Sequence, residues 1–214
     1  MKTALIAGCT GLVGKHLIDL LLASDQYSSV IALTRTPLAS KHPKLRNIIT
    51  GFNNIDESQF LEVKPSDVFC CLGTTMAKAG SKEKFYEVDF QYPLSLAKAT
   101  LKTGAKQFML ISALGADKNS SVYYNRVKGE LEEAIRSLDF ETIHFFRPSL
   151  LLGARSERRP GEDVAKFLFK VFGFAVPEKY KAIHAEKVAR AMLSFASKNQ
   201  KGVFIHESRE MQYC

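Results

Sequence analysis

The segment that decides the fold is TALIAGCTGLVG, residues 3–14, in which an apolar run leads into three glycines. Residues 3–7 have the composition of a buried strand, and residues 12–22 that of a helix. Gly8, Gly11 and Gly14 stand at the junction, spaced GxxGxxG in place of the commoner GxGxxG. Such a turn lets backbone approach a pyrophosphate, whose charge the N–H groups of the following helix attract. The segment therefore predicts a nucleotide-binding turn, although glycines also form tight turns for structural reasons alone.

Strand and helix patterns alternate along all 214 residues. Further strands are predicted at 30–34, 47–50, 67–72, 107–112, 142–146 and 202–206, and helices at 85–102, 124–138 and 185–198. Pro93 should bend or divide the helix over 85–102, and Gly104 should end it. Apolar strands that alternate with helices predict a parallel sheet covered on both faces. The expected fold class is therefore α/β, a Rossmann-like single domain over 1–214 with a mostly parallel sheet flanked by helices.

The composition, 46% apolar and 24% charged, is that of a soluble globular protein. The apolar run at the N-terminus is too short for a signal-peptide core or a membrane span, so no membrane association is expected. The four cysteines lack CxxC or Cys/His spacing, which predicts reduced thiols, no metal site and a cytoplasmic protein. A formal charge of +8 permits nucleic-acid binding, but the lysines are scattered. We favour a solvated basic surface suited to an anionic cofactor, with no nucleic-acid partner.

The end of the second predicted strand bears on the choice of dinucleotide. In NAD-binding sheets an acidic residue about 20 positions beyond the glycines holds the adenosine ribose. Here the corresponding stretch is Leu33-Thr34-Arg35-Thr36, which contains no acid. The planar cation of Arg35 suits the additional phosphate of NADP, whereas the alternative is an ordinary surface arginine. The sequence therefore favours NADP(H) over NAD(H).

The stretch YYNRVKG, residues 123–129, carries a candidate acid–base pair. Residues four apart on an α-helix differ by about 40° and share a face, which joins Tyr124 to Lys128, whereas Tyr123 lies about 140° from the lysine. A neighbouring ammonium favours a phenolate, so that the phenol can exchange a proton near neutral pH. Such pairs are common on structural helices, but Ser112 ends a strand twelve residues before Tyr124. Because parallel sheets bind cofactors at that edge, the context favours a catalytic pair.

These motifs occur in the order used by the short-chain dehydrogenase/reductase superfamily. The blocks SALGADKNSSVYYNRVKGELE (112–132) and FRPSLLLGARSERRPGE (146–162) resemble its atypical branch, specifically the Tat-interacting-protein type of NAD(P)H-binding oxidoreductase and its bacterial relatives. The resemblance covers nearly the whole chain. It implies that Tyr124 is the general acid or base, that Lys128 tunes it and holds the nicotinamide ribose, and that Ser112 donates to the substrate carbonyl.

The resemblance also implies where the cofactor lies: pyrophosphate on the glycine turn, adenosine at the fourth strand, nicotinamide beside the loop after 142–146. The implied cofactor-binding residues are Gly8, Thr10, Gly11, Leu12, Val13, Gly14, Arg35, Cys71, Leu72, Gly73, Thr74, Tyr124, Lys128, Arg147, Pro148, Ser149, Leu150 and Arg155. Two departures from the superfamily stand out. Ala113 replaces a second serine that relatives can carry, and no asparagine is assignable to the proton relay.

The sequence thus predicts an NADP(H)-dependent oxidoreductase that acts on a small carbonyl or alcohol. The alternative is a non-catalytic NADPH-binding module that reports to a protein partner, and a homodimer also stays open. A sugar-nucleotide epimerase is disfavoured by Arg35 and because only 65 residues follow Ser149. A small substrate-side segment is expected at about 150–183, where Phe169 and Phe174 suit a lid, a partner contact or simple packing. His144 and His206 are interpreted as structural.

Overall fold

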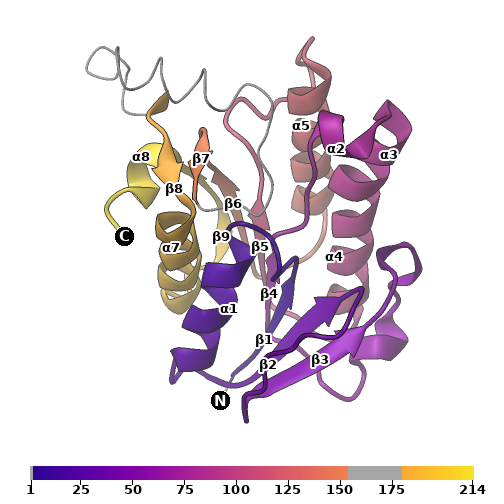
Figure 1. Ribbon diagram of the computed structural model, residues 1–214, viewed down its shortest axis with the longest axis vertical. Coiled ribbons are helices and arrows are strands. Elements are labelled where there is room, and N and C mark those ends of the chain that lie inside the picture. Colours follow the sequence, from indigo (N-terminus) through magenta and orange to yellow (C-terminus); the bar gives the residue numbers. More distant parts are fainter. Residues whose placement is uncertain (1, 154–179) are drawn as a thin grey trace.

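Seven strands form one sheet at the centre of the structure, in the order β3-β2-β1-β4-β5-β6-β9 (Figure 1). The computed structural model describes residues 2–153 and 180–214. The strands are β1 (Lys2–Ala7), β2 (Tyr27–Thr34), β3 (Leu45–Ile49), β4 (Asp67–Cys70), β5 (Gln107–Ile111), β6 (Thr142–Arg147) and β9 (Gly202–Glu207). Every neighbouring pair is parallel. The strand order reverses between β1 and β4, which places a crevice at their carboxyl ends.

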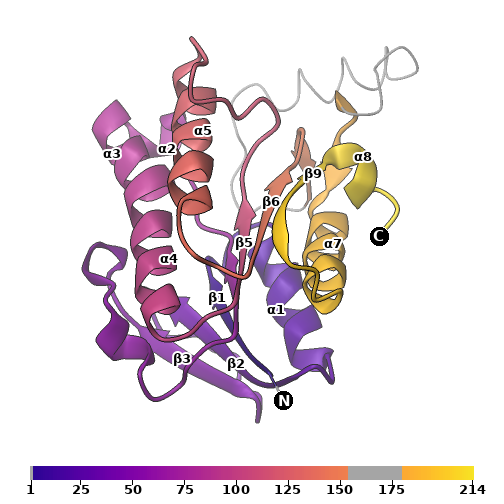
Figure 2. The ribbon, with the colours of Figure 1, turned by 180° about the vertical axis from the view of Figure 1, so that it is seen from behind.

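Helices cover both faces of this sheet (Figures 1 and 2). On one face lie α1 (Gly14–Ala23) and α7 (Ala185–Ser197), and on the other α4 (Tyr92–Lys102) and α5 (Tyr123–Arg136). Each face buries its own hydrophobic core. The shorter elements are η1 (Phe52–Asn54), η2 (Glu57–Phe60), α2 (Met76–Ala79), α3 (Lys82–Tyr86), η3 (Glu87–Gln91), β7 (Leu151–Leu152), β8 (Ile183–His184) and α8 (Ser208–Met211). The predicted Rossmann-like α/β domain is confirmed.

The helix predicted over 85–102 is divided, as Pro93 implied. Proline has no N–H, so an α-helical hydrogen bond to the carbonyl of Asp89 cannot form at Pro93. Instead η3 is a π-helical turn, in which the N–H of Tyr92 donates to the carbonyl of Glu87, five residues earlier. The wider turn changes which side chains face the sheet, and Asp89 becomes fully buried. Gly104 ends α4 with a φ of +93°, as predicted.

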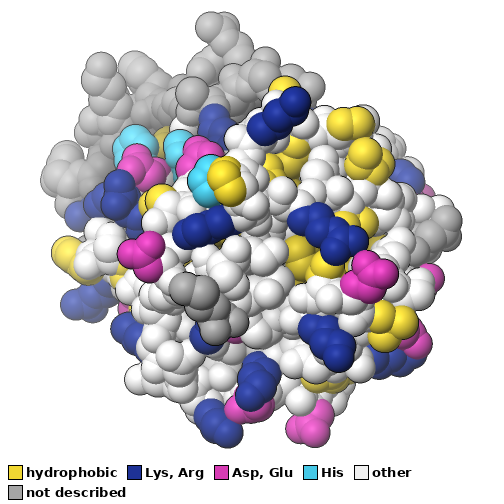
Figure 3. Space-filling model, turned by 90° about the horizontal axis from the view of Figure 1, so that it is seen from below, with side chains coloured by type: hydrophobic (Ala, Val, Ile, Leu, Met, Phe, Trp, Pro, Cys, Tyr) yellow, Lys and Arg dark blue, Asp and Glu magenta, His cyan; other side chains and the backbone are white. Residues whose placement is uncertain are grey.

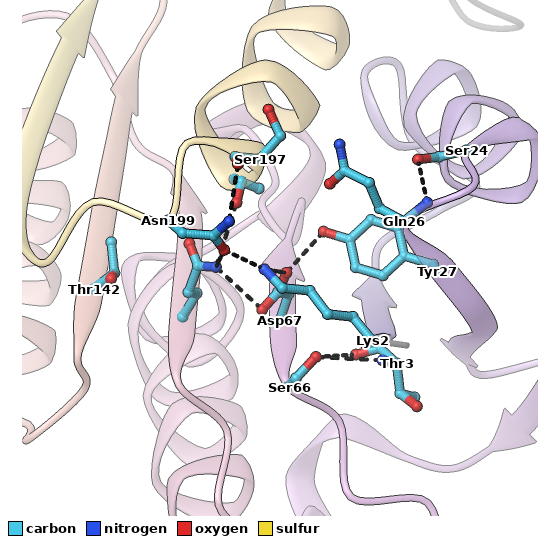
Figure 4. Close-up of polar contacts among 12 residues, drawn as sticks. Lys2, Thr3, Ser24, Gln26, Tyr27, Ser66, Asp67, Thr142, Ser197 and Asn199 are labelled. Atoms are coloured by element: carbon cyan, nitrogen blue, oxygen red, sulfur yellow. Dashed lines mark hydrogen bonds and ion pairs between the residues drawn. The ribbon is translucent and has the colours of Figure 1, made fainter.

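A buried polar cluster joins the amino ends of the central strands, opposite the crevice (Figure 4). Asp67, at the start of β4, is 1% exposed. Its carboxylate accepts hydrogen bonds from the Tyr27 hydroxyl at 2.8 Å, the Lys2 ammonium at 3.0 Å and the Gln107 amide at 3.3 Å. Because these donors come from β2, β1 and β5, one carboxylate ties four strand starts together.

Surface charge is mixed on the side of the molecule seen from below (Figure 3). Lys and Arg side chains are spread over that face, with Asp and Glu side chains between them. Within the described part of the chain, no helix is long and apolar enough to cross a lipid bilayer.

Candidate functional site

A cavity of about 260 Å³ opens at the carboxyl edge of the sheet. It lies between the loops that follow β1, β4, β5 and β6, with one wall formed by α5. Of the residues predicted for the site, thirteen line it: Gly11, Leu12, Val13, Cys71, Leu72, Gly73, Thr74, Ser112, Tyr124, Lys128, Pro148, Ser149 and Leu150. Residues without a predicted role also line it: Thr75, Asp89, Ile111, Ala113 and Leu151. Motifs far apart in the sequence therefore meet in one cavity.

The glycine turn between β1 and α1 is too tight for side chains at two positions. Gly8 has a φ of +84°, and a Cβ there would lie 2.6 Å from the carbonyl oxygen of Cys71. A Cβ on Gly14 would lie 2.1 Å from the carbonyl oxygen of Gly8. These two glycines let the turn close against β4 and α1, and neither lines the cavity. Between these two glycines, the residues that line the cavity are Gly11, Leu12 and Val13, at the N-terminus of α1.

The two tyrosines of YYNRVKG have different surroundings. Tyr123 donates its hydroxyl to the carbonyl of Lys82 at 2.9 Å and so fastens α5 to α3. Tyr124 lines the cavity, and its ring packs on Phe85 with centroids 5.6 Å apart. A Cβ on Gly129 would lie 2.2 Å from the backbone of Asp117, so this glycine permits the loop after β5 to lie against α5. The structure thus brings Tyr124, and not Tyr123, to the cavity with Lys128.

Lys128 is 3% exposed and ion-paired with Asp89, Nζ to Oδ1 at 2.7 Å. The other carboxylate oxygen of Asp89 accepts the backbone N–H of Thr74 at 2.7 Å. Burial lowers the pKa of Lys128, but Asp89, with a smaller contribution from Tyr124, raises that pKa above its ordinary value. Lys128 is therefore a fixed ammonium in the cavity wall.

Sequence reasoning missed Asp89. Its side chain reaches the cavity through the π-helical turn η3, whose register a regular helix pattern does not show. The available signal was an acidic residue four positions before a proline within an apolar helix. No asparagine was assignable to the proton relay, and the structure places this carboxylate beside the lysine instead.

Ser112 lines the cavity, but its hydroxyl faces a second buried carboxylate. It donates to Glu132 Oε1 at 2.5 Å, and Glu132 is 2% exposed. Arg147 binds the same carboxylate with two hydrogen bonds, Nε to Oε1 at 2.9 Å and Nη2 to Oε2 at 2.5 Å. Glu132 thereby raises the pKa of Arg147. Arg147, expected beside the nicotinamide, is instead held by Glu132 and does not line the cavity, because a buried carboxylate requires a cation.

The loop after β6 lies at the opposite wall. Ser149 donates its N–H to the Ser208 hydroxyl at 2.7 Å and its own hydroxyl to the Lys181 carbonyl at 2.5 Å. Leu151, in β7, pairs with Ile183 in β8. The C-terminal part of the chain therefore holds Pro148, Ser149 and Leu150 against the cavity.

Several predicted residues lie elsewhere. Thr10 is exposed on the glycine turn, and Arg35 is exposed just after β2. Neither side chain lines the cavity. Arg155, Phe169, Phe174 and most of the 150–183 segment lie outside the described residues.

His144 and His206 form a buried pair away from the cavity. Nδ1 of His144 lies 2.9 Å from Nε2 of His206, whose Nδ1 lies 2.8 Å from Glu210 Oε2. Burial, and next the positive charge that His206 can carry, lower the pKa of His144 to about 4. The pair joins β6 to β9 within a stack of aromatic rings.

Comparison with known proteins now gives the family. Residues 4–204 match the model of the NAD dependent epimerase/dehydratase family. The chain belongs to this family. Among its relatives, protein fmp52, mitochondrial, of Emericella nidulans is 38% identical over 179 residues, covering 81% of this chain and 77% of that protein. Protein HTATIP2 of Rattus norvegicus is 37% identical over 199 residues, covering 90% of this chain and 80% of the rat protein. The resemblance to Tat-interacting-protein-type proteins is confirmed.

Solved structures of other NAD-bound proteins have the same fold. MoeE5 in complex with UDP-glucose and NAD superposes with a TM-score of 0.71 at 16% identity, covering 98% of this chain and 79% of that one. The Bordetella bronchiseptica enzyme WbmH in complex with NAD+ gives 0.72 at 15% identity, covering 97% and 76%. At this identity the likeness shows the fold alone.

One expectation is contradicted by the relatives. We expected a cytoplasmic protein from the cysteines and the apolar pattern. The fmp52 relatives from several fungi are named mitochondrial proteins, which overturns that expectation. Thiol usage does not separate the two compartments, because free cysteines suit the cytosol and other reducing compartments equally.

Proposed function

We propose that this member of the epimerase/dehydratase family is an NADP(H)-dependent oxidoreductase acting on a small carbonyl or alcohol. The observation that carries the proposal is that Tyr124 and Lys128 line the same cavity as the glycine turn. A proton donor and a cation thus adjoin a glycine turn of the kind that binds the pyrophosphate of a dinucleotide. The structural neighbours MoeE5 and WbmH were solved in complex with NAD, which supports dinucleotide binding in general.

The residues present fit a dinucleotide. Glycines that admit no Cβ bring the backbone of residues 11–13 to the cavity at the N-terminus of α1, where N–H groups attract phosphate. Cys71, Leu72, Gly73 and Thr74 follow β4 and line the same cavity, and we assign them to the adenosine part of the cofactor. Arg35 supports NADP(H) over NAD(H), because an exposed guanidinium at the end of β2 suits a phosphate on the adenosine ribose.

The proposed chemistry is reduction of a carbonyl to an alcohol. When bound, the reduced nicotinamide supplies a hydride to the carbonyl carbon. Tyr124 donates its phenolic proton to the carbonyl oxygen, and solvent returns a proton to the phenolate afterwards. Lys128, held by Asp89, provides the positive charge that stabilises this phenolate and a donor for the ribose hydroxyls. The reverse sequence oxidises the alcohol.

The Ser112 hydroxyl supports a second candidate function. For Ser112 to orient a substrate carbonyl, its hydroxyl has to turn away from Glu132, to which it now donates. The next position, Ala113, lines the cavity but has no hydroxyl. A cavity in which the Ser112 hydroxyl is already bonded to Glu132 suits a non-catalytic NADPH-binding module that signals to a protein partner. The name of the rat relative refers to protein interaction, in keeping with this alternative.

A carbonyl screen separates the two candidates. The full chain is incubated with NADPH and a panel of aldehydes, ketones and quinones, and absorbance at the NADPH band is followed. Deuteride transfer from labelled NADPH to the product establishes the reaction. Turnover of a carbonyl confirms the oxidoreductase, whereas tight NADPH binding with no turnover across the panel refutes it in favour of the module.

A further inference from the structure

The turn that carries Arg35, residues 34–38, is held by one side chain of the neighbouring strand. Asn47 lies in β3, opposite Ala32 of β2. Its amide nitrogen donates to the Ala32 carbonyl at 2.9 Å and to the Thr34 hydroxyl at 2.7 Å. Its amide oxygen accepts the N–H of Leu38 at 2.9 Å. Both ends of the turn are thus bound to the same amide.

Thr34 extends this network into the middle of the turn. Its hydroxyl, which accepts from Asn47, donates to the carbonyl of Thr36 at 2.8 Å. Thr34 is 6% exposed, and Leu38 packs on the core between the sheet and α1. Pro37 further restricts the backbone. The turn is therefore rigid, although Arg35 itself is exposed and makes no hydrogen bond or ion pair with another described residue.

The register of the sheet places this turn beside the glycine turn. β1 and β2 are parallel, with Ala7 opposite Leu33. One residue further along, Gly8 follows β1 where Thr34 ends β2. Arg35 is the next residue after β2, so its guanidinium lies at the same edge of the sheet as the backbone of the glycine turn, where the phosphates are expected. A fixed turn lowers the conformational entropy that Arg35 loses when it binds an anion.

We propose that Asn47 is a positioning residue that holds Arg35 ready for the phosphate on the adenosine ribose of NADP(H), and thereby sets the preference over NAD(H). This inference rests on the NADP(H) preference proposed above. Asn47 acts through the backbone of the turn and touches no part of the cofactor itself. Its loss should therefore weaken NADPH binding selectively and leave NADH binding nearly unchanged.

The test measures dissociation constants for NADPH and NADH by calorimetry on the full chain. Asn47→Leu removes all three hydrogen bonds and should weaken NADPH binding about tenfold, with NADH binding changed less than about twofold. A tenfold loss is the scale expected when one long side chain, here Arg35, has to be ordered on binding. Thr34→Val is isosteric, removes the relay to Thr36, and should shift the NADPH/NADH ratio in the same direction. If Asn47→Leu fails to fold, the NADPH/NADH ratio of Thr34→Val tests the proposal alone.

Two further variants complete the comparison. Thr142→Val removes a buried hydroxyl that donates to the Gln200 carbonyl at 2.8 Å, at the opposite edge of the sheet, and should leave the ratio unchanged. Arg35→Ala tests the underlying preference. If Arg35→Ala abolishes the preference but Asn47→Leu and Thr34→Val keep the wild-type ratio, or weaken both cofactors equally, the role of Asn47 is refuted and the NADP(H) proposal stands. A wild-type chain without NADPH preference overturns both.

Discussion

Replacing Asp89 by asparagine probes the part of the site that the sequence did not reveal. Two unit charges 2.7 Å apart attract each other by about 6 kcal/mol at an effective dielectric constant of ~20. Asparagine has one oxygen, so it can accept from Lys128 or from Thr74, but not from both in the present geometry. The lysine then stays buried beside a neutral group. From the cost of breaking buried pairs, we expect Asp89→Asn to lower the free energy of unfolding by about 3–5 kcal/mol.

Urea unfolding at pH 7 measures this loss, and an exposed pair provides the control. Glu186 accepts from Arg190 at 2.7 Å, the same separation, but both side chains are 54% exposed. Glu186→Gln should change stability far less, because water screens the pair. NMR of the Lys128 side chain should also show its pKa falling in Asp89→Asn, since burial is then opposed only by the smaller contributions of Tyr124 and Cys70.

A double variant tests whether the buried charge itself is the cause. Asp89→Leu/Lys128→Met removes both charges and should be more stable than Asp89→Asn alone. Equal, small losses for Asp89→Asn and Glu186→Gln would refute the reasoning. So would a double variant that is as unstable as the sum of its parts, because the two residues would then act independently.

Three further predictions concern the rest of the fold. Burial lowers the pKa of His144 from an ordinary 6.5 to about 4, so the unfolded chain takes up a proton first as the pH falls, and the free energy of unfolding should drop by about 3 kcal/mol between pH 6.5 and pH 4. In His144→Phe, the free energy of unfolding measured in urea should depend less on pH over that range. An unchanged dependence would contradict this prediction. Tyr27→Phe should lower stability by about 2 kcal/mol through its lost bond to buried Asp67, with NADPH affinity, measured by calorimetry, unchanged. Gly14→Ala, whose Cβ would lie 2.1 Å from a backbone oxygen, should distort the glycine turn and abolish dinucleotide binding in the same assay; wild-type affinity would argue against a cradle there.

Periodicity and turn residues were sufficient to predict the sheet and its covering helices. The strand predicted for TALIA corresponds to β1, and the helix predicted over 124–138 corresponds to α5. Gly104 ends α4, as expected. These features depend on local sequence and on burial of apolar faces, which a single chain records directly.

The contents of the site were only partly predictable. Tyr124 and Lys128 could be placed together because helical spacing fixes their shared face. Asp89 could not, since a π-helical turn set by Pro93 shifts the register. The direction of the Ser112 hydroxyl depended on Glu132, twenty residues away, whose carboxylate looked like an ordinary helix surface group in the sequence. A polar contact between residues far apart in the sequence does not show in the hydrophobic periodicity of the chain.

The measurement that bears most directly on the proposed redox chemistry compares Tyr124→Phe with the wild-type chain, for both turnover and NADPH affinity. With a carbonyl from the screen as substrate, the variant should lose turnover by two to four orders of magnitude, about the contribution of general acid catalysis. Its dissociation constant for NADPH should stay within about twofold of the wild-type value, since the phenol is not needed for the phosphate contacts. Turnover that survives the loss of the hydroxyl would contradict a proton transfer from this residue.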